Sequence, residues 1–139
     1  MIDSAVTARP LRRALLIDDE TSIRAALRRY FEKRGWTVQE AEHGRAGLER
    51  ILGAESEDLF EIIVSDLRMP VMSGVELHDC LARERPEALL RTIFVAGDMT
   101  SPDMAAFLER TARPVIQKPF ELSALGTVVQ AVLEKVSES

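Results

Sequence analysis

Short runs of apolar residues, each followed by a helix-like segment, limit most strongly the folds that this chain can adopt. Continuous runs lie at 14–17 and 62–64 and are followed directly by polar residues, and a mainly apolar run lies at 90–95. Strands that are apolar throughout, rather than at alternate positions, are typical of parallel sheets whose two faces are both covered by helices. The pattern therefore predicts an α/β fold.

Strand-like and helix-like segments alternate along the whole chain. We expect strands at 13–17, 36–40, 60–65, 90–95 and 114–117. We expect helices at 21–34, 45–52, 74–85, 102–110 and 122–136. This alternation predicts a three-layer, doubly wound sandwich around a parallel sheet. Residues 1–11 show no apolar periodicity and are expected to form a flexible lead-in to a domain at 12–136, which leaves a tail at 137–139.

The composition excludes several classes of protein. A chain of 139 residues, 46% hydrophobic and 29% charged, is typical of one folded globular domain and not of a disordered segment. Cys80 is the single cysteine, so neither an internal disulfide nor a cysteine-based zinc site can form. The apolar runs are too short for a membrane span or an export signal, which favours a cytoplasmic protein with no membrane contact.

The net charge of −5 counts against direct nucleic-acid binding, which usually needs a basic surface. Basic residues are nevertheless concentrated in the first predicted helix, and we interpret them as a solvated helix face rather than a docking patch. They are Arg24, Arg28, Arg29, Lys33 and Arg34.

Charged residues follow three of the predicted strands directly. Asp18 and Asp19 follow the first strand, Asp66 follows the third, and Lys118 follows the fifth. Ligands of an open parallel sheet bind beyond the carboxyl ends of its strands. We therefore expect three aspartates and one lysine to meet at one edge of the sheet.

Such a cluster has a clear chemical use. Three carboxylates at short range repel one another, and a divalent cation together with Lys118 would balance their charge. Ligands that are all oxygen select a hard cation such as Mg²⁺, which commonly shares its coordination with a phosphate. Asp66 stands alone on a central strand and is the candidate nucleophile for a phosphoryl group, whose charge the metal and Lys118 would stabilise.

Each part of the cluster has an ordinary explanation when taken alone. The acidic run at 18–20 suits a helix N-terminus, where the helix dipole favours negative charge. A single lysine such as Lys118 is usually solvated. The joint occurrence at three strand ends favours a functional site.

An ordered series of motifs resembles the receiver domain of response regulators in two-component signalling. The motifs are Leu-Leu-Ile-Asp-Asp-Glu at 15–20, Val-Ser-Asp-Leu-Arg-Met-Pro at 64–70, Met-Ser-Gly-Val-Glu-Leu at 72–77, Val-Ala-Gly-Asp at 95–98 and Val-Ile-Gln-Lys-Pro-Phe at 115–120. The resemblance covers residues 12–136 and implies the flavodoxin-like receiver fold, with five parallel strands in the order 2-1-3-4-5.

The resemblance also implies a function and roles for individual residues. Asp66 would accept a phosphoryl group from the phosphohistidine of a sensor histidine kinase or a histidine phosphotransfer protein. Asp66, Asp19 and the backbone carbonyl of Arg68 would bind Mg²⁺, with Asp18 acting through a water molecule. Lys118 would hold a phosphoryl oxygen, and the peptide bond that follows it would be cis. The chain would then act on a downstream protein target and would catalyse only its own phosphorylation and dephosphorylation.

Two positions depart from the family pattern. Ala96 stands where receivers usually carry a Thr or Ser that bonds the phosphoryl group, and Val115 stands where many carry an aromatic residue. The usual hydroxyl-to-aromatic switch is therefore absent, and any signal must travel by another route. Arg68 and Asp98 flank the place where attacking water would enter, so we expect them to affect the lifetime of the phosphoryl group.

Two other functions remain open on the sequence. A pseudo-receiver would bind partners without phosphate control, and Ala96 and Val115 support this reading. A Mg²⁺-dependent phosphohydrolase would need a second acid two residues after its nucleophile, and the residue there is Arg68. The phosphoaccepting receiver is the function that the sequence favours.

A few further residues carry expectations that a structure can test. His43 and His78 are expected to be surface histidines without a catalytic role. Gly74 is expected to allow the turn after Pro70, with a positive φ as one way of doing so. The face formed by residues 102–136 is the surface that the family uses for partners, and a homodimer through it is one alternative.

Overall fold

All five predicted strands are found in one parallel sheet. The computed structural model describes residues 12–138. The strands, in their order across the sheet, are β2 (Thr37–Ala41), β1 (Arg13–Ile17), β3 (Ile62–Asp66), β4 (Thr92–Ala96) and β5 (Val115–Gln117). Each neighbouring pair is parallel. The expected sheet order, 2-1-3-4-5, is confirmed.

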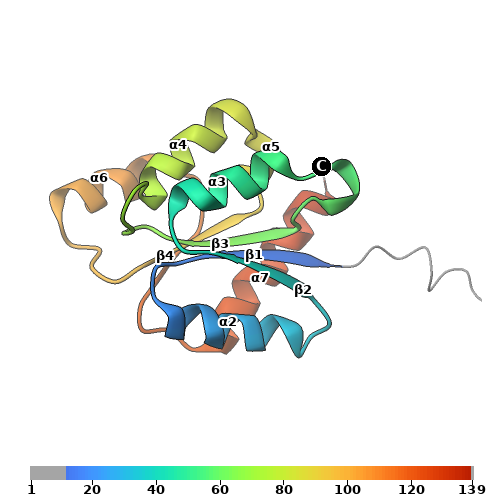
Figure 1. Ribbon diagram of the computed structural model, residues 1–139. Coiled ribbons are helices and arrows are strands. Elements are labelled where there is room, and N and C mark those ends of the chain that lie inside the picture. Colours follow the sequence, from blue (N-terminus) through green and yellow to red (C-terminus); the bar gives the residue numbers. More distant parts are fainter. Residues whose placement is uncertain (1–11, 139) are drawn as a thin grey trace, which may run out of the picture.

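Helices cover both faces of this sheet and complete the three predicted layers. They are α2 (Thr21–Glu32), α3 (Gly44–Gly53), α4 (Gly74–Glu84), α5 (Pro86–Leu89), α6 (Pro102–Arg110) and α7 (Leu122–Ser137), with a short 3₁₀ turn, η1 (Ser56–Asp58). Figure 1 shows α2 and α7 below the sheet, and α3, α4 and α5 above it. None of the helices within residues 12–138 is long and apolar enough to cross a membrane.

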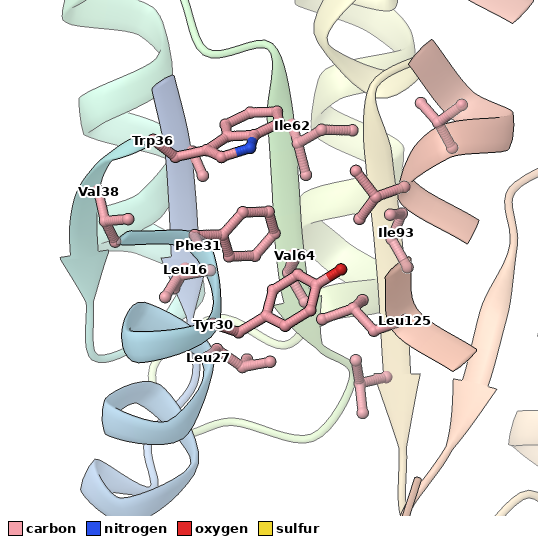
Figure 2. Packing of buried hydrophobic residues seen from close by; sticks show 14 residues of the cluster. Leu16, Leu27, Tyr30, Phe31, Trp36, Val38, Ile62, Val64, Ile93 and Leu125 are labelled. Atoms are coloured by element: carbon pink, nitrogen blue, oxygen red, sulfur yellow. The ribbon is translucent and has the colours of Figure 1, made fainter. Parts of the chain in front are cut away.

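The continuous apolar strands supply both faces of the sheet. In β1, Ala14 and Leu16 pack on the side of α2 and α7, whereas Leu15 and Ile17 pack on the side of α3 and α4. Figure 2 shows the first of these two cores, in which Phe31 and Tyr30 of α2 face the strands and Leu125 of α7. Burial on both sides explains why the strands carry no polar alternation.

Element boundaries differ from the predicted ones by a few residues, and the two single-turn helical elements, α5 and η1, were not predicted. The helix expected at 21–34 ends at Glu32, and Gly35 adopts a φ of +87° in the turn that follows. The single turns α5 and η1 are too short to show a periodic pattern. α7 extends to Ser137, the first residue of the predicted tail, and the lead-in at 1–11 lies outside the described residues.

The prediction that both histidines lie at the surface is wrong for His78. The residue is buried at 8% exposure, and its ring packs edge-on against Phe107 at 4.9 Å between ring centres. Its Nδ1 lies 2.9 Å from Asp79 Oδ1, and its Nε2 lies 3.0 Å from Thr111 Oγ1. His43 is half-buried and caps α3, because its Nδ1 accepts a hydrogen bond from the Ala46 N–H.

A positive φ at Gly74 is also not found. Among the described residues, positive φ values occur at Gly35 and Val71. Gly74 is needed for a different reason: a Cβ at this position would collide with the backbone oxygen of Asp66. The first turn of α4 can therefore approach the end of β3 closely.

Candidate functional site

The carboxyl ends of β1 and β3 bring the predicted acidic residues together. Asp18 follows β1 directly, and Asp66 is the last residue of β3, which pairs with β1. Carboxylate oxygens of Asp18, Asp19 and Asp66 all lie within 4.8 Å of one another. Asp18 and Asp66 are buried, at 3% and 6% exposure, whereas Asp19 is exposed. The cluster thus has two buried acids and one that faces solvent.

Lys118, which follows β5, reaches into this cluster. Its Nζ lies 3.1 Å from Asp66 Oδ2 and 3.3 Å from Asp18 Oδ2. A third carboxylate, that of Glu20, also accepts a hydrogen bond from Nζ at 3.1 Å. The four side chains singled out in the sequence therefore meet at one edge of the sheet, and their functional roles stay a prediction.

Backbone groups hold the cluster in place. Asp18 Oδ1 accepts a hydrogen bond from the Glu20 N–H at 2.9 Å, and Asp66 Oδ1 accepts one from the Arg68 N–H at 3.3 Å. The Lys118 N–H donates to the Ala96 carbonyl at 2.7 Å, which continues the pairing of β4 and β5. The Lys118–Pro119 peptide bond is cis, as the family resemblance implied.

Burial and charge act in opposite directions on these groups. Burial raises the pKa of Asp66 above its ordinary value, although the Lys118 ammonium works against this rise. Burial raises the pKa of Asp18 as well; the Glu20 N–H opposes this, and the charge of Asp66 adds to it. Burial disfavours the charge of Lys118, but the Glu20 hydrogen bond and the two aspartates outweigh it, so the pKa of its amine is raised. The acids therefore stabilise the positive charge of Lys118, and their own negative charges are stabilised by a cation beside them.

The donor set fits a magnesium ion. It consists of carboxylate oxygens at short mutual distance, with no sulfur or imidazole in the cluster formed by the described residues. Hard cations prefer such ligands, and Mg²⁺ needs only one or two carboxylates because it keeps several waters. Asp19 and Asp66 are the residues placed to offer them.

Arg24 holds the backbone of the site at Asp18. The prediction that its side chain lies on a solvated helix face is wrong. The side chain is buried, its Nε donates to Glu40 Oε1 at 2.8 Å, and its NH1 donates to the backbone oxygen of Asp18. Arg28 donates to the other oxygen of Glu40 at 2.6 Å. The remaining three basic residues, Arg29, Lys33 and Arg34, are exposed as expected. The first strand-to-helix loop is thus fixed by a buried guanidinium that the sequence pattern did not reveal.

Ala96 lies at the end of β4 beside the acidic cluster and carries no hydroxyl group. It is buried at 1% exposure in an apolar cluster with Leu67, Met104 and Phe107. Val115 on β5 packs partly against the same cluster. This part of the site is therefore joined to α6 by apolar packing instead of a hydrogen bond.

An open groove of about 820 Å³ lies next to the cluster, between the β3–α4 loop and the start of α6. Asp19 and Arg68 line it on the site side, and Ser101 and Met104 line it at the start of α6. Arg68 and Asp98 are both exposed. The Asp98 carboxylate accepts hydrogen bonds from Thr100, which lower its pKa, and the charge of Arg68 contributes to the same shift. An incoming group thus has room to approach the acidic cluster from solvent.

The sheet order and this site define a class of signalling domain, and comparison with known proteins identifies it. The family model described as "Response regulator receiver domain" matches residues 14–130. The chain belongs to this family and is a receiver domain of two-component signal transduction.

Individual relatives support this assignment. The chain is 37% identical over 124 residues to the sensor kinase CckA of Brucella abortus (strain 2308), a match that covers 87% of this chain but only 12% of that kinase. It is 30% identical over 126 residues to the response regulator receiver protein CpdR of the same organism, covering 88% of this chain and 98% of CpdR. Similar domains thus occur both as part of a long kinase and as nearly a whole protein.

A solved structure shows the same fold. A CheY-like response regulator receiver domain protein from Methanospirillum hungatei JF-1 has 27% sequence identity and a TM-score of 0.77, and the match covers 93% of this chain and 99% of that one. The predicted receiver fold is therefore confirmed.

Proposed function

We propose that this receiver domain accepts a phosphoryl group on Asp66 from the phosphohistidine of a sensor histidine kinase or a histidine phosphotransfer protein. The observation that carries the proposal is the Lys118 Nζ, 3.1 Å from Asp66 Oδ2, inside a cluster with Asp18 and Asp19. The chain then acts on a downstream protein and catalyses only its own phosphorylation and dephosphorylation. Its partner surface is the face formed by residues 102–136, through which a homodimer is an alternative.

The reaction is a transfer between two nucleophiles. A carboxylate oxygen of Asp66 attacks phosphorus, the bond between phosphorus and the donor imidazole nitrogen breaks, and its electron pair stays on that nitrogen. Phosphorylated Asp66 is a mixed anhydride, which water later hydrolyses back to the carboxylate and inorganic phosphate. Lys118 is placed to hold an oxygen of the transferred group and to balance charge that develops on it. The Arg68 N–H keeps the attacking carboxylate in its orientation.

Magnesium belongs to this proposal because the acids fit it. Asp19, Asp66 and the backbone carbonyl of Arg68 would bind the ion directly, and Asp18 would act through water. Bound Mg²⁺ supplies positive charge that lets the phosphoryl oxygens approach the carboxylates. Without it, two buried acids would repel an anionic donor.

The main alternative is a pseudo-receiver, whose partner binding ignores phosphate. The burial of Ala96 in an apolar cluster favours it, since the phosphoryl group would find no hydroxyl donor there. The phosphohydrolase alternative has less support, because the residue two positions after Asp66 is an exposed arginine.

Incubation with acetyl phosphate and Mg²⁺, followed by intact-protein mass spectrometry, tests the proposal. We expect the mass of one phosphoryl group to appear on the wild-type chain, to disappear with Asp66→Asn, and to persist with Asp58→Asn, the same change at an exposed acid in η1. Mg²⁺ should also raise the melting temperature of the wild type, and this rise should be lost in Asp19→Asn.

Each other outcome points elsewhere. Absence of labelling by acetyl phosphate and by phosphorylated histidine kinases would favour the pseudo-receiver. Sustained turnover of a phosphate ester would favour the phosphohydrolase. Labelling that survives in Asp66→Asn would overturn the choice of acceptor.

A further inference from the structure

Glu20 forms an ion pair with Lys118, the cation of the site, and the proposed function gives this contact no role. Its carboxylate lies 3.1 Å from Lys118 Nζ, as close as that of Asp66. It differs from the other two partners of Lys118 in exposure: the Glu20 side chain is 57% exposed, whereas those of Asp18 and Asp66 are 4% and 7% exposed. Within residues 12–138, the Glu20 carboxylate has no other hydrogen-bond partner.

The three contacts use the full donor capacity of Lys118. An ammonium group has three N–H bonds and no acceptor, and three carboxylates surround this one. Under the proposed function, Lys118 must also bind an oxygen of the incoming phosphoryl group. One of its present partners therefore has to leave.

The structure indicates which partner can leave. Asp66 becomes part of the phosphorylated group and stays beside the lysine. Asp18 is buried, and its Oδ1 is tied to the Glu20 N–H at 2.9 Å. Glu20 has a long, exposed side chain whose displacement into water exposes no buried charge, and exposed ion pairs of this kind are weak.

We propose that Glu20 is a positioning residue that holds the Lys118 ammonium in the unphosphorylated site and yields its place to the incoming phosphoryl group. The proposal rests on the proposed function and adds to it that Glu20 slows phosphorylation. Glu20 competes for Lys118, and its negative charge repels an anionic donor at the mouth of the site. In agreement with this role, the Glu20 hydrogen bond is the strongest of the influences that raise the pKa of Lys118.

The decisive variant is Glu20→Gln, which keeps the size of the side chain and removes its charge. We expect the rate constant for phosphorylation by acetyl phosphate with Mg²⁺ to rise about two- to fivefold, the range that loss of one exposed ion pair allows. Glu20→Asp, which keeps the charge, should stay nearer to the wild-type rate than Glu20→Gln does. Glu121→Gln is the matched control, because it removes an exposed carboxylate three residues after Lys118, whereas the ion pairs of Lys118 are with Asp18, Glu20 and Asp66.

A second measurement reports on Lys118 without metal or phosphate. The ammonium protons of Lys118, assigned by comparison with Lys118→Arg, can be followed by ¹⁵N NMR in Mg²⁺-free buffer. We expect them to exchange with water faster in Glu20→Gln than in the wild type, and to be unchanged in Glu121→Gln. Thermal melts of all variants check that the fold is intact.

The outcomes separate this inference from the function on which it rests. A wild-type chain that no phosphodonor labels would overturn both. If the wild type is labelled but Glu20→Gln reacts at the same rate or more slowly, Glu20 does not slow phosphorylation and the proposed function stands. A faster Glu20→Gln with unchanged exchange of the Lys118 protons would show repulsion alone, and would overturn the positioning role.

Discussion

Val71 adopts a backbone conformation that favours glycine. Its φ is +69°, and its side chain is 70% exposed, so packing contributes little at this position. The left-handed conformation costs an L-residue about 1–2 kcal/mol, and a β-branched side chain suits it poorly. Since glycine loses part of this gain through its greater freedom in the unfolded chain, we expect Val71→Gly to raise the free energy of unfolding by about 0.5–1 kcal/mol. Chemical denaturation measures it.

Gly35 provides the opposite change as a control. Its φ is +87°, and a Cβ there would meet no atom within 4 Å, so only the backbone conformation opposes a side chain. Gly35→Ala should lower the free energy of unfolding by about 1 kcal/mol. A loss of stability in Val71→Gly would show that the Val71 side chain makes contacts that outweigh its backbone strain.

Individual residues could be predicted from the sequence only where a local pattern determines their position. The acids and the lysine of the site directly follow strands or end them, so the predicted sheet was enough to bring them together. Arg24 and His78 were misplaced because their burial depends on distant partners. Glu40 lies 16 positions from Arg24, and Thr111 lies 33 positions from His78. No helical periodicity reveals such pairs.

At the scale of elements, the end of α6 is joined to α4 by a polar network. Asp79 can only accept hydrogen bonds as a carboxylate, and although burial opposes its charge, Arg110 and His78 lower its pKa. Nδ1 of His78 therefore donates to the Asp79 carboxylate, and Nε2 lies 3.0 Å from the Thr111 hydroxyl. The Thr111 oxygen in turn accepts from the Arg113 N–H at 3.0 Å. The Thr111 hydroxyl is the central group of the network.

Thr111→Val tests this network with little change in shape. The variant leaves His78 Nε2 and the Arg113 N–H without their partner, so we expect the free energy of unfolding to fall by about 1–2 kcal/mol. Thr127→Val is the control, because the Thr127 hydroxyl is exposed on α7 and bonds only to the Ser123 carbonyl. Thermal and chemical unfolding measure both variants. Equal stability of Thr111→Val and the wild type would show that the hydrogen bonds to the Thr111 oxygen contribute nothing to stability.

At the scale of the whole molecule, the site exists only in the assembled sheet. Lys118 and Asp18 are 100 positions apart in the chain, and two strands, β3 and β4, separate β5 from β1, which Asp18 follows. The alternation of strands and helices predicted the layers, and the family motifs supplied the sheet order. The energetic cost of the buried carboxylate charges could not be predicted this way, because it depends on how deeply Asp18 and Asp66 are buried.

The cost of these buried charges gives the stability of the metal-free protein a specific pH dependence. The pKa of Asp66 is raised in the folded state, first by burial, so its ionised form opposes folding at neutral pH. As the pH falls through the folded pKa towards the unfolded one, the folded protein takes up the proton first and this penalty disappears. Glu40 acts oppositely: its lowered pKa, due first to the Arg28 hydrogen bond, adds stability that is lost in acid. The difference between a variant and the wild type isolates the effect of one group.

Asp66→Asn should therefore raise the melting temperature of the Mg²⁺-free protein at pH 7, and the gain should shrink as the pH is lowered into the range where wild-type Asp66 becomes protonated. The Lys118 ammonium loses one carboxylate partner in this variant but keeps Asp18 and Glu20. The variant no longer buries a negative charge, and we expect this gain in stability to outweigh the lost ion pair. Asp98→Asn is the control, because hydrogen bonds from Thr100 lower the pKa of this exposed acid, and its removal should bring no gain. Thermal melts between pH 4 and 8 without metal measure the difference. A gain that stays constant with pH, or a loss at pH 7, would show that the Lys118 contact dominates the folded-state energy of Asp66.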